Sequence, residues 1–302
     1  MSILLTGASG FIGKELNLKV ECRNVLRGFP SKSDDSCFFI EKLDGGTCWN
    51  DAFVGMESVI HLAGLAHSDT FTLSDYLTVN VEGTLHLARK AAEAGVKRFV
   101  FVSSIGVNGL LSGCKPFTFS SQPKPHSEYA KSKYEAEVGL LNISKETGIE
   151  LVIVRPTLVY GVNAPGNFGK LTKLINKLPL LPFGLVNNKR DFIAVKNLAD
   201  LLILCAHHPN AAGHVFLASD GETVSIKEFT NAIAKGLGKS VIQFPVPISL
   251  MKTISNILGK KVMVNQLLSS LEVDSSNIQE VLGWSPPYTM EQAMASLSES
   301  KK

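Results

Sequence analysis

The chain has 302 residues and a mass of 32.6 kDa, which is enough to bury a full core in one large α/β unit or in a nucleotide-binding domain with a smaller companion. Its formal net charge is only +3, and its charged residues form no basic tract, which argues against a nucleic-acid partner. The five cysteines are scattered, with no C-x-x-C pair and no His/Cys cluster at metal spacing. We therefore expect a reducing compartment and no metal site.

No uninterrupted apolar stretch reaches the length of a membrane span, and no charged leader precedes a cleavable apolar segment. A cytoplasmic protein with no integral membrane segment is therefore expected. Residues 246–264 are amphipathic and carry lysines, so this segment could lie on a membrane surface. A packed helix in a small lobe is the preferred interpretation.

Short β-branched runs alternate with helical patterns in the first half of the chain. The runs are SILLT (2–6), ESVIHLAG (57–64), RFVFVSS (98–104) and ELVIVRPTLVYG (150–161). This alternation predicts an α/β fold with a buried parallel sheet and crossover helices. After about residue 160 the sequence changes to proline-rich and glycine-rich loops. We therefore expect a nucleotide-binding domain over 1–160 with returning segments at about 191–220, and a smaller, interleaved substrate lobe mainly over 161–302.

The motif TGASGFIG places glycines directly after the first predicted strand, at the spacing G-x-x-G-x-x-G. Such a turn needs a tight backbone, a close approach to a pyrophosphate and a helix start whose amide groups face the phosphates. The motif predicts a Rossmann-type, doubly wound dinucleotide site, and a glycine-rich turn without a ligand is the alternative. The residues expected at the cofactor are Gly7, Gly10, Phe11, Ile12 and Gly13.

The segment after this turn is short for a helix and a second strand. If VECRNVLR (20–27) is the strand, residues 14–18 leave only one or two turns of helix. The tip of that strand offers Arg27, whereas Glu21 and Arg23 come too early. Because an arginine there favours a 2′-phosphate and a carboxylate favours ribose hydroxyls, the cofactor is predicted as NAD or NADP.

Further along, SEYAKSKYEAE (127–137) places Tyr129 and Lys133 four residues apart on a predicted helix, so they share one face. A phenol is a poor base at neutral pH, but a nearby ammonium and an oxidised nicotinamide both favour the phenolate. Tyr-x-x-x-Lys can then move a proton to or from a sugar hydroxyl, although an exposed helical pair is the alternative. Ser104 ends the preceding strand, at the sheet edge where ligands bind.

Together these residues resemble the extended short-chain dehydrogenase/reductases, and among them the NAD-dependent nucleotide-sugar epimerase/dehydratase family. The resemblance covers nearly the whole chain. Its ordered matches are TGASGFIG, HLAG (61–64), VNVEGT (79–84), FVSSIGVNG (101–109), YAKSK (129–133), RPTLVYG (155–161), RDFIAVKNLAD (190–200) and VDSSNIQEVLGWSPP (273–287).

The resemblance implies that Ser104, Tyr129 and Lys133 are catalytic, with the tyrosine and the lysine also touching the cofactor. The further cofactor contacts that it implies are Asp44 near the adenine, Leu62, Ala63, Gly64 and Asn80 along the cofactor path, Ser103, and Pro156, Leu158 and Val159 near the nicotinamide.

On the substrate side, the resemblance implies that Asn167 and Arg190 join Ser104, the arginine binding a nucleotide diphosphate through its two-pronged guanidinium. A surface cation is the alternative for Arg190. Two departures affect this side: Asn108 stands where relatives often have an aromatic residue, and Gln266 stands where a second diphosphate arginine is usual. Neither removes a proton-transfer group.

The leading functional interpretation is 4-epimerisation of a UDP-hexose or UDP-N-acetylhexosamine. The alternative is an NAD(P)H-dependent 4-ketoreductase that acts on a UDP-4-keto-6-deoxy sugar in surface-polysaccharide synthesis, and a non-catalytic dinucleotide sensor is third. A dehydratase is disfavoured because Ile105 and Gly106 offer neither an acid nor a base. The sequence leaves open whether the sugar is carried on UDP or on a lipid diphosphate.

By resemblance, helices at about 79–94 and 127–147 pair across a homodimer. His61 and His67 are interpreted as packing residues and not as metal ligands.

Overall fold

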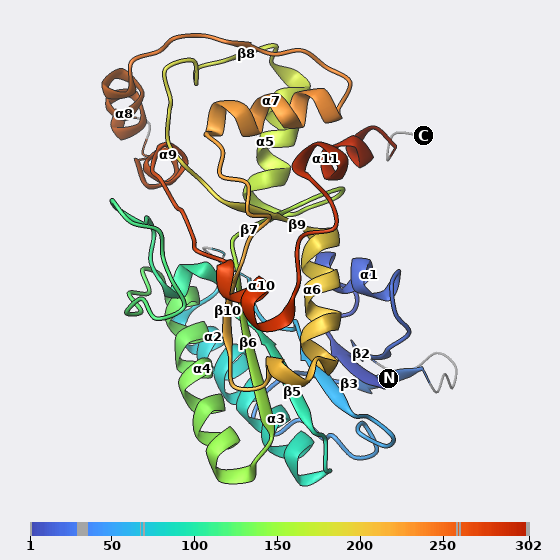
Figure 1. Ribbon diagram of the computed structural model, residues 1–302. Coiled ribbons are helices and arrows are strands. Elements are labelled where there is room, and N and C mark those ends of the chain that lie inside the picture. The colour runs from blue at the N-terminus through green and yellow to red at the C-terminus, as the bar shows by residue number, and fades with distance from the viewer. Residues whose placement is uncertain are drawn as a thin grey trace.

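The computed structural model describes residues 2–28, 36–66, 68, 70–257, 259 and 261–299 (Figure 1). Its centre is a seven-stranded sheet in the order β10-β6-β5-β4-β1-β2-β3, in which every pairing is parallel. The strands are β1 (Ile3–Thr6), β2 (Arg23–Arg27), β3 (Cys37–Ile40), β4 (Ser58–His61), β5 (Arg98–Val102), β6 (Glu150–Pro156) and β10 (Val215–Ala218). The predicted α/β fold with a Rossmann-type parallel sheet is confirmed.

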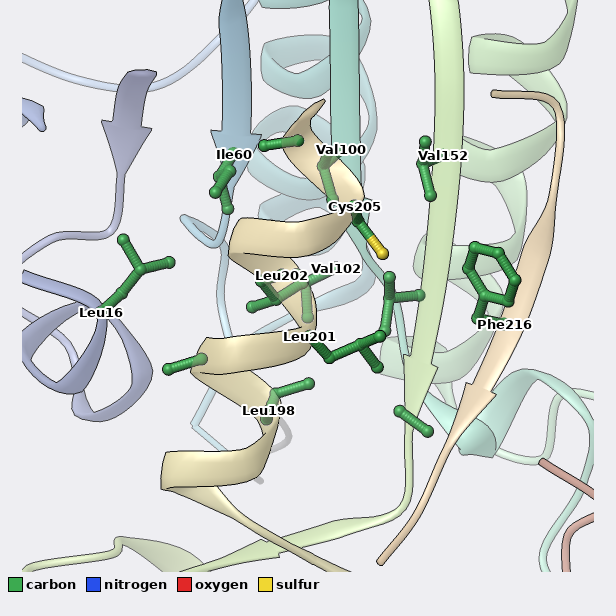
Figure 2. Packing of buried hydrophobic residues seen from close by; sticks show 14 of the residues in the cluster. Leu16, Ile60, Val100, Val102, Val152, Leu198, Leu201, Leu202, Cys205 and Phe216 are labelled. Atoms are coloured by element: carbon green, nitrogen blue, oxygen red, sulfur yellow. The ribbon is translucent and has the colours of Figure 1, made fainter. Parts of the chain in front are cut away.

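Helices cover both faces of this sheet, as buried parallel strands require. One face carries α1 (Phe11–Asn17) and α6 (Val195–His207), and the other carries α3 (Thr84–Glu93) and α4 (Glu128–Thr147). Figure 2 shows the α6 side, where Leu198, Leu201 and Leu202 are fully buried in the same cluster as Val100 and Val152 of the sheet. The short α2 (Leu73–Tyr76) and a π-helical stretch (Leu77–Gly83) lead into α3.

A smaller lobe lies above the sheet in Figure 1 and has its own aromatic core. In that core the rings of Phe192 and Phe229 stack with centroids 3.7 Å apart. Its strands form two short parallel pairs, β7 (Leu158–Tyr160) with β9 (Phe192–Ala194) and β8 (Leu180–Leu181) with β11 (Ile242–Gln243). Its helices are α5 (Gly166–Lys177), α7 (Ile226–Gly236), α8 (Ile248–Ile257), α9 (Lys261–Leu268) and α11 (Met290–Glu299).

The chain crosses between the two parts more than once. After β9 it returns to the large sheet through α6, a 3-10 turn (Pro209–Ala211) and β10, and α10 (Ser276–Leu282) later packs beside β10. The carboxyl ends of the parallel strands meet at one edge, where Thr6 lies opposite His61 and Val102 lies opposite Val154. Because the helix-bearing loops leave from this edge, it is the expected place for a ligand.

The first helix is as short as the sequence predicts. It has seven residues, and β2 starts at Arg23, whose Nη1 donates to the carbonyl oxygen of Asp51 at 2.7 Å. Arg23 therefore lies at the beginning of the strand, and Arg27 is exposed at its end. Among the described helices, none combines the length and the apolar composition needed to cross a membrane.

Candidate active site

The glycine turn after β1 is closed tightly against the loop after β4. Gly7 has φ of +74°, and a Cβ there would lie 2.8 Å from the amide nitrogen of Ala63. A Cβ on Gly13 would overlap the carbonyl oxygen of Gly7, and the amide of Gly10 donates to that same oxygen at 3.0 Å. No side chain fits at Gly7 or Gly13 without a clash, which keeps the turn closely packed. Ser9 and Gly10, just before Phe11, are exposed where a phosphate group would bind.

Asn80 is fully buried, and its side chain forms hydrogen bonds with the loop after β4. Its Oδ1 accepts from the amide of Leu65 at 2.7 Å, and its Nδ2 donates to Leu65 O and to Ser132 Oγ, both at 3.1 Å. A Cβ on Gly64 would lie 2.8 Å from Asn80 Oδ1. Asn80 thus holds Leu65, the residue after Leu62 to Gly64, and joins this loop to α4.

Ser104 and Tyr129 are brought together from β5 and α4. Ser104 follows the strand and caps a 3-10 turn (Ile105–Val107), its Oγ accepting from the amide of Gly106 at 3.1 Å. Tyr129 lies in the first turn of α4, which begins at the N-cap Ser127. Burial raises the pKa of Tyr129 to about 12, and a hydrogen bond between its side chain and that of Ser104 opposes this rise.

Lys133 lies one helical turn from Tyr129 and points inward. Its Nζ donates to the carbonyl oxygen of Val102 at 3.0 Å and lies 4.6 Å from the centroid of the Phe101 ring. Burial lowers the pKa of Lys133 to about 8, against the opposing effect of Glu137. The side chain is 4% exposed, so the alternative of an exposed helical pair is wrong.

A buried polar network lies behind Lys133, and the sequence analysis missed it. Arg155 donates from Nε and Nη2 to the two oxygens of Glu137 at 2.9 and 2.5 Å, and from Nη1 to Asn108 Oδ1 at 3.0 Å. Asn108 is fully buried, so this position binds β6 and does not line an open sugar site. The available signal was Glu137, which continues the helix face of Tyr129 and Lys133 by one turn.

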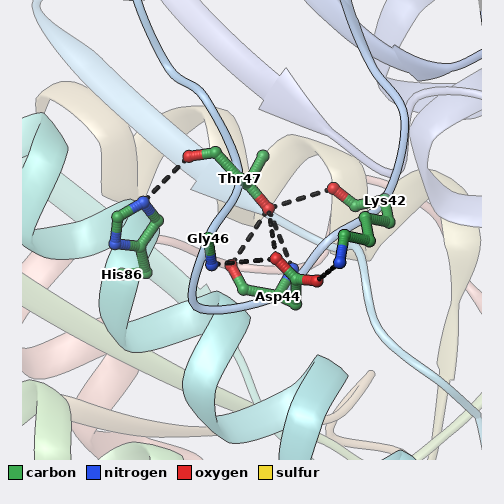
Figure 3. Close-up of polar contacts among 5 residues, drawn as sticks. All are labelled: Lys42, Asp44, Gly46, Thr47 and His86. Atoms are coloured by element: carbon green, nitrogen blue, oxygen red, sulfur yellow. Dashed lines mark hydrogen bonds and ion pairs between the residues drawn. The ribbon is translucent and has the colours of Figure 1, made fainter.

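At the predicted adenine end, Arg27 is the last residue of β2, and Asp44 follows the adjacent strand β3. Figure 3 shows the loop that holds Asp44, whose carboxylate pairs with Lys42 at 2.6 Å and accepts from the amide of Gly46 at 2.9 Å. These two contacts lower the pKa of Asp44 below its usual range. Thr47 closes the loop, and its carbonyl oxygen accepts from His86 Nε2 at 2.9 Å.

The predicted nicotinamide end lies where β5 and β6 finish. Ser103 Oγ is buried and has no hydrogen-bond partner among the described residues, which is the condition expected of a group that awaits a ligand. Pro156 ends β6, and Leu158 and Val159 begin β7, half-buried at the junction of the two lobes.

On the predicted substrate side, Asn167 is exposed in the first turn of α5. Arg190 is not a surface cation, because its Nη1 donates to the carbonyl oxygens of Gln266 and Ser269 at 2.6 and 2.8 Å. Burial lowers its pKa to about 10, partly offset by Asp191. Arg190 therefore binds the carboxyl end of α9, and Gln266 lies beside it.

The loop before Tyr129 is tied to the segment that follows α9. The amide of Phe117 donates to Glu272 O at 2.8 Å, and the amide of Asp274 donates to Phe117 O at 2.7 Å. The amide of Ser112 donates to Ser270 O at 3.1 Å. Residues 270–274 thus connect the active-site loop with α9 and Arg190.

His61 is a packing residue, as predicted. It is fully buried, 2.6 Å from Thr6 Oγ1 through Nδ1 and 2.9 Å from Thr84 Oγ1 through Nε2. His67 lies outside the described residues. Within the described part of the chain, no three His, Cys, Asp or Glu side chains are grouped as a metal site would require.

The parallel sheet, the glycine turn, and Ser104, Tyr129 and the buried Lys133 at one strand edge define an extended short-chain dehydrogenase/reductase. The model of the NAD dependent epimerase/dehydratase family matches residues 3–219, and the chain belongs to that family. The resemblance found in the sequence is thus confirmed.

Two curated relatives extend over nearly the whole chain. A UDP-glucose 4-epimerase of Vibrio cholerae is 39% identical over 312 residues, which cover 99% of this chain and 95% of the relative. An N-acetyl-α-D-glucosaminyl-diphospho-ditrans,octacis-undecaprenol 4-epimerase of Escherichia coli O157:H7 is 26% identical, with 97% and 93% covered. Among solved structures, UDP-glucuronic acid 4-epimerase from Bacillus cereus in complex with NAD has a TM-score of 0.76 at 21% identity, with 99% and 98% covered, and shows the same fold.

The residues of this chain fit the nicotinamide dinucleotide on which the family depends. The glycine turn exposes Ser9 and Gly10 beside the start of α1, and the orphaned Ser103 hydroxyl lies at the strand end expected for the nicotinamide. The chain is therefore an enzyme of an NAD-dependent nucleotide-sugar family.

Proposed function

We propose that the protein interconverts the C4 epimers of a UDP-hexose or UDP-N-acetylhexosamine. The observation that carries the proposal is the hydrogen-bonded Ser104 and Tyr129 with Lys133 one helical turn away, at the strand edge beside the glycine turn. The activity named for the 39% identical Vibrio cholerae relative supports the same reaction.

In this proposal Ser104 binds the C4 hydroxyl of the sugar and Tyr129 takes its proton. With a pKa of about 12, Tyr129 is a neutral phenol at neutral pH, so proton removal requires added positive charge. Lys133 supplies part of that charge as an ammonium below its pKa of about 8. A bound oxidised dinucleotide would supply the rest of the charge and the hydride acceptor. Tyr129 then returns the proton when C4 is reduced on its other face.

The test is to incubate the purified protein with UDP-glucose, UDP-galactose and their N-acetyl forms, and to follow products and reduced-nicotinamide absorbance together. An epimerase returns the hydride, so the sugars interconvert with no net absorbance change. Stoichiometric loss of NAD(P)H with a UDP-4-keto-6-deoxy sugar, and no interconversion of the simple sugars, would instead establish the 4-ketoreductase.

A second candidate substrate is an N-acetylhexosamine carried on a lipid diphosphate, which is favoured by the activity named for the Escherichia coli relative. The chemistry at C4 is the same, and only the group beyond the diphosphate differs. Assaying N-acetylglucosaminyl-diphospho-undecaprenol beside UDP-N-acetylglucosamine separates the two carriers by the ratio of kcat/KM values.

The remaining features of the proposal concern binding and assembly. Asn167 and Arg190 bind the diphosphate within a substrate lobe formed mainly by residues 161–302. Arg27 stays a predicted contact for a 2′-phosphate, which titration with NAD and NADP tests. The enzyme is proposed to act as a cytoplasmic homodimer, and its five free thiols are in keeping with a reducing compartment.

A further inference from the structure

The outer end of the small lobe carries a concentration of exposed apolar side chains. More than half of the exposed large apolar residues in the described part of the chain belong to this lobe. They come from α5, from the β8 and β11 pair with their flanks, and from α8, which lie at the top of the molecule in Figure 1. We call these residues the apolar face: Leu174, Leu178, Leu180, Leu185, Ile242, Phe244, Leu250, Ile254 and Ile257.

Two parts of the apolar face are regular: one is a cross-strand pair, and the other is a row of residues along one side of a helix. Leu180 and Ile242 are directly opposite each other in the β8 and β11 pair and are 50% and 67% exposed. On α8, Leu250, Ile254 and Ile257 recur at the spacing of one helix face and are 49%, 45% and 80% exposed. The opposite side of α8 is the packed one, since Ser255 is 4% exposed. Ile248 and Met251 on that side pack against the core of the small lobe, so α8 carries apolar residues on both sides and leaves this stripe exposed.

The same region is strongly positive. Residues 161–190 and 229–271 contain ten lysines and arginines and no aspartate or glutamate, although the whole chain has a net charge of only +3. The lysines at 170, 173, 177, 239 and 252 are exposed, and none of them forms an ion pair with another described residue. Two other lysines of these ranges do pair with acidic side chains, Lys189 with Glu272 and Lys235 with Glu291. The apolar face therefore carries the positive charge of five lysines that no described carboxylate neutralises.

The exposed apolar side chains and the positive charge together indicate what docks on the apolar face. A second copy docked through the same face would bring two positively charged surfaces together, which is repulsive. Leucine, isoleucine and phenylalanine side chains interspersed with free lysines are instead the pattern of proteins that rest on an anionic lipid surface, where the apolar groups enter the headgroup boundary and the lysines meet lipid charge. We propose that the apolar face docks the enzyme on an anionic membrane surface. The inference is independent of the sugar that the enzyme uses.

The test is co-sedimentation of the purified full-length protein with vesicles of phosphatidylglycerol and phosphatidylcholine, compared with vesicles of phosphatidylcholine alone. We expect binding to the anionic vesicles that weakens as salt is raised. Ile254→Glu and Ile257→Glu each lower the partition constant about tenfold or more, because an inserted isoleucine is lost and a repelled charge is gained. Lys173→Gln and Lys177→Gln lower it about fivefold each.

Matched variants lie on the large lobe. Leu18→Glu changes an apolar residue that is 80% exposed, as Ile257 is, and Lys145→Gln removes an exposed lysine of α4. Both are expected to bind vesicles as the unchanged protein does, and circular dichroism verifies the fold of every variant. Absent binding to anionic vesicles, equal binding to neutral ones, or an equal loss in Leu18→Glu would overturn the proposal. So would a change of mass by light scattering in Ile254→Glu, because the face would then be a contact between copies.

Discussion

The environment of Tyr129 favours the neutral phenol, so the phenolate should form only when the cofactor site is filled. Burial alone keeps it neutral, with a pKa of about 12, and Ser104 lowers that pKa only in part. We expect Tyr129→Phe to fold and bind dinucleotide normally but to lower turnover by about two to four orders of magnitude, the usual size of general acid–base assistance. Tyr134→Phe, a tyrosine of the same helix, is the control. A Tyr129→Phe enzyme with near wild-type turnover would remove this residue from the reaction.

Arg190 makes structural contacts in the protein and is also proposed to bind the diphosphate. Arg190→Ala removes a charged hydrogen-bond donor to the substrate. We expect it to raise KM about tenfold to a hundredfold with a smaller effect on kcat, because the contact exists in the ground state and in the transition state alike. Asn188→Ala is the matched control, because Asn188 Nδ2 donates to Leu267 O and Ser269 O at the same end of α9, at 3.0 Å each. If Asn188→Ala raises KM as much as Arg190→Ala does, the effect is structural and the diphosphate site lies elsewhere.

His61 makes the free energy of unfolding depend on pH. Burial, aided by Lys133, lowers its pKa from 6.5 to about 3 in the folded protein. The unfolded chain therefore binds a proton between pH 6.5 and 3 that the folded chain does not, so stability is retained above pH 6.5 and lost as the pH falls below it. The loss attributable to His61 is about 2 kcal/mol at pH 5. Denaturant unfolding of the wild type and His61→Gln at pH 7 and pH 5 measures it, and parallel losses in both proteins would contradict it.

Residue-level chemistry was predictable where it depends on spacing within one element. Tyr129 and Lys133 share a helix face because they are four residues apart, and Ser104 ends a strand that the β-branched run predicts. Asn108 and Arg155 meet across 47 positions of sequence, so no local pattern indicates their contact. Arg190 was predicted as a ligand contact, and its bonds to the end of α9 likewise depend on the packing of distant segments.

At the scale of elements, the buried face of α4 positions the side chains of the active site. Tyr129, Lys133 and Glu137 follow at successive turns, and Glu137 holds Arg155 in a pair whose side chains are 2% and 6% exposed. Glu137→Gln leaves a buried guanidinium without its counter-charge, which is expected to lower the free energy of unfolding by about 3–5 kcal/mol. It also removes a charge that raises the pKa of Lys133, so that ammonium should be lost at a lower pH.

The control for this element is the exposed pair of Lys235 and Glu291. Glu291→Gln should leave the free energy of unfolding unchanged, because such a pair is solvated on both sides. Denaturant unfolding monitored by circular dichroism compares the two variants. Similar small effects of both substitutions would show that the buried pair does not hold α4 against β6.

The short first helix shows what sequence can resolve at this scale. A short helix was predictable because the glycine turn and the β-branched run limit the space between them. Its bounds were not, because the helix begins at Phe11 and not at residue 14, and the strand begins at Arg23 and not at residue 20. The hydrogen bonds between the loop before Tyr129 and residues 270–274 were not predictable because they join segments separated by more than 150 residues. Pairing between remote irregular segments has no periodic signature.

For the whole molecule, the alternation of strand and helix patterns predicted the parallel sheet because every buried strand is a nearly continuous apolar run. The position of α8 was less predictable. Its amphipathic pattern favoured a packed helix, and Ile248 and Met251 do pack against the core of the small lobe, but the structure also leaves the apolar Ile254 exposed. Hydrophobic periodicity identifies an apolar face but does not say what covers it, and only the arrangement of the complete lobe shows that this face is uncovered.

Assembly is the remaining question at this scale. The predicted homodimer pairs helices at about 79–94 and 127–147, and α4 has Val138 and Leu141 exposed at 42% each, on the side away from the sheet. Burying such residues between two copies would stabilise the association, whereas a carboxylate placed there would be desolvated without a partner. We therefore expect the wild type to be a dimer by light scattering at micromolar concentration and Leu141→Glu to be a monomer. Ile254→Glu, on the apolar face of the small lobe, should remain a dimer. A monomeric wild type, or a Leu141→Glu protein that stays dimeric, would place the contact elsewhere or remove it.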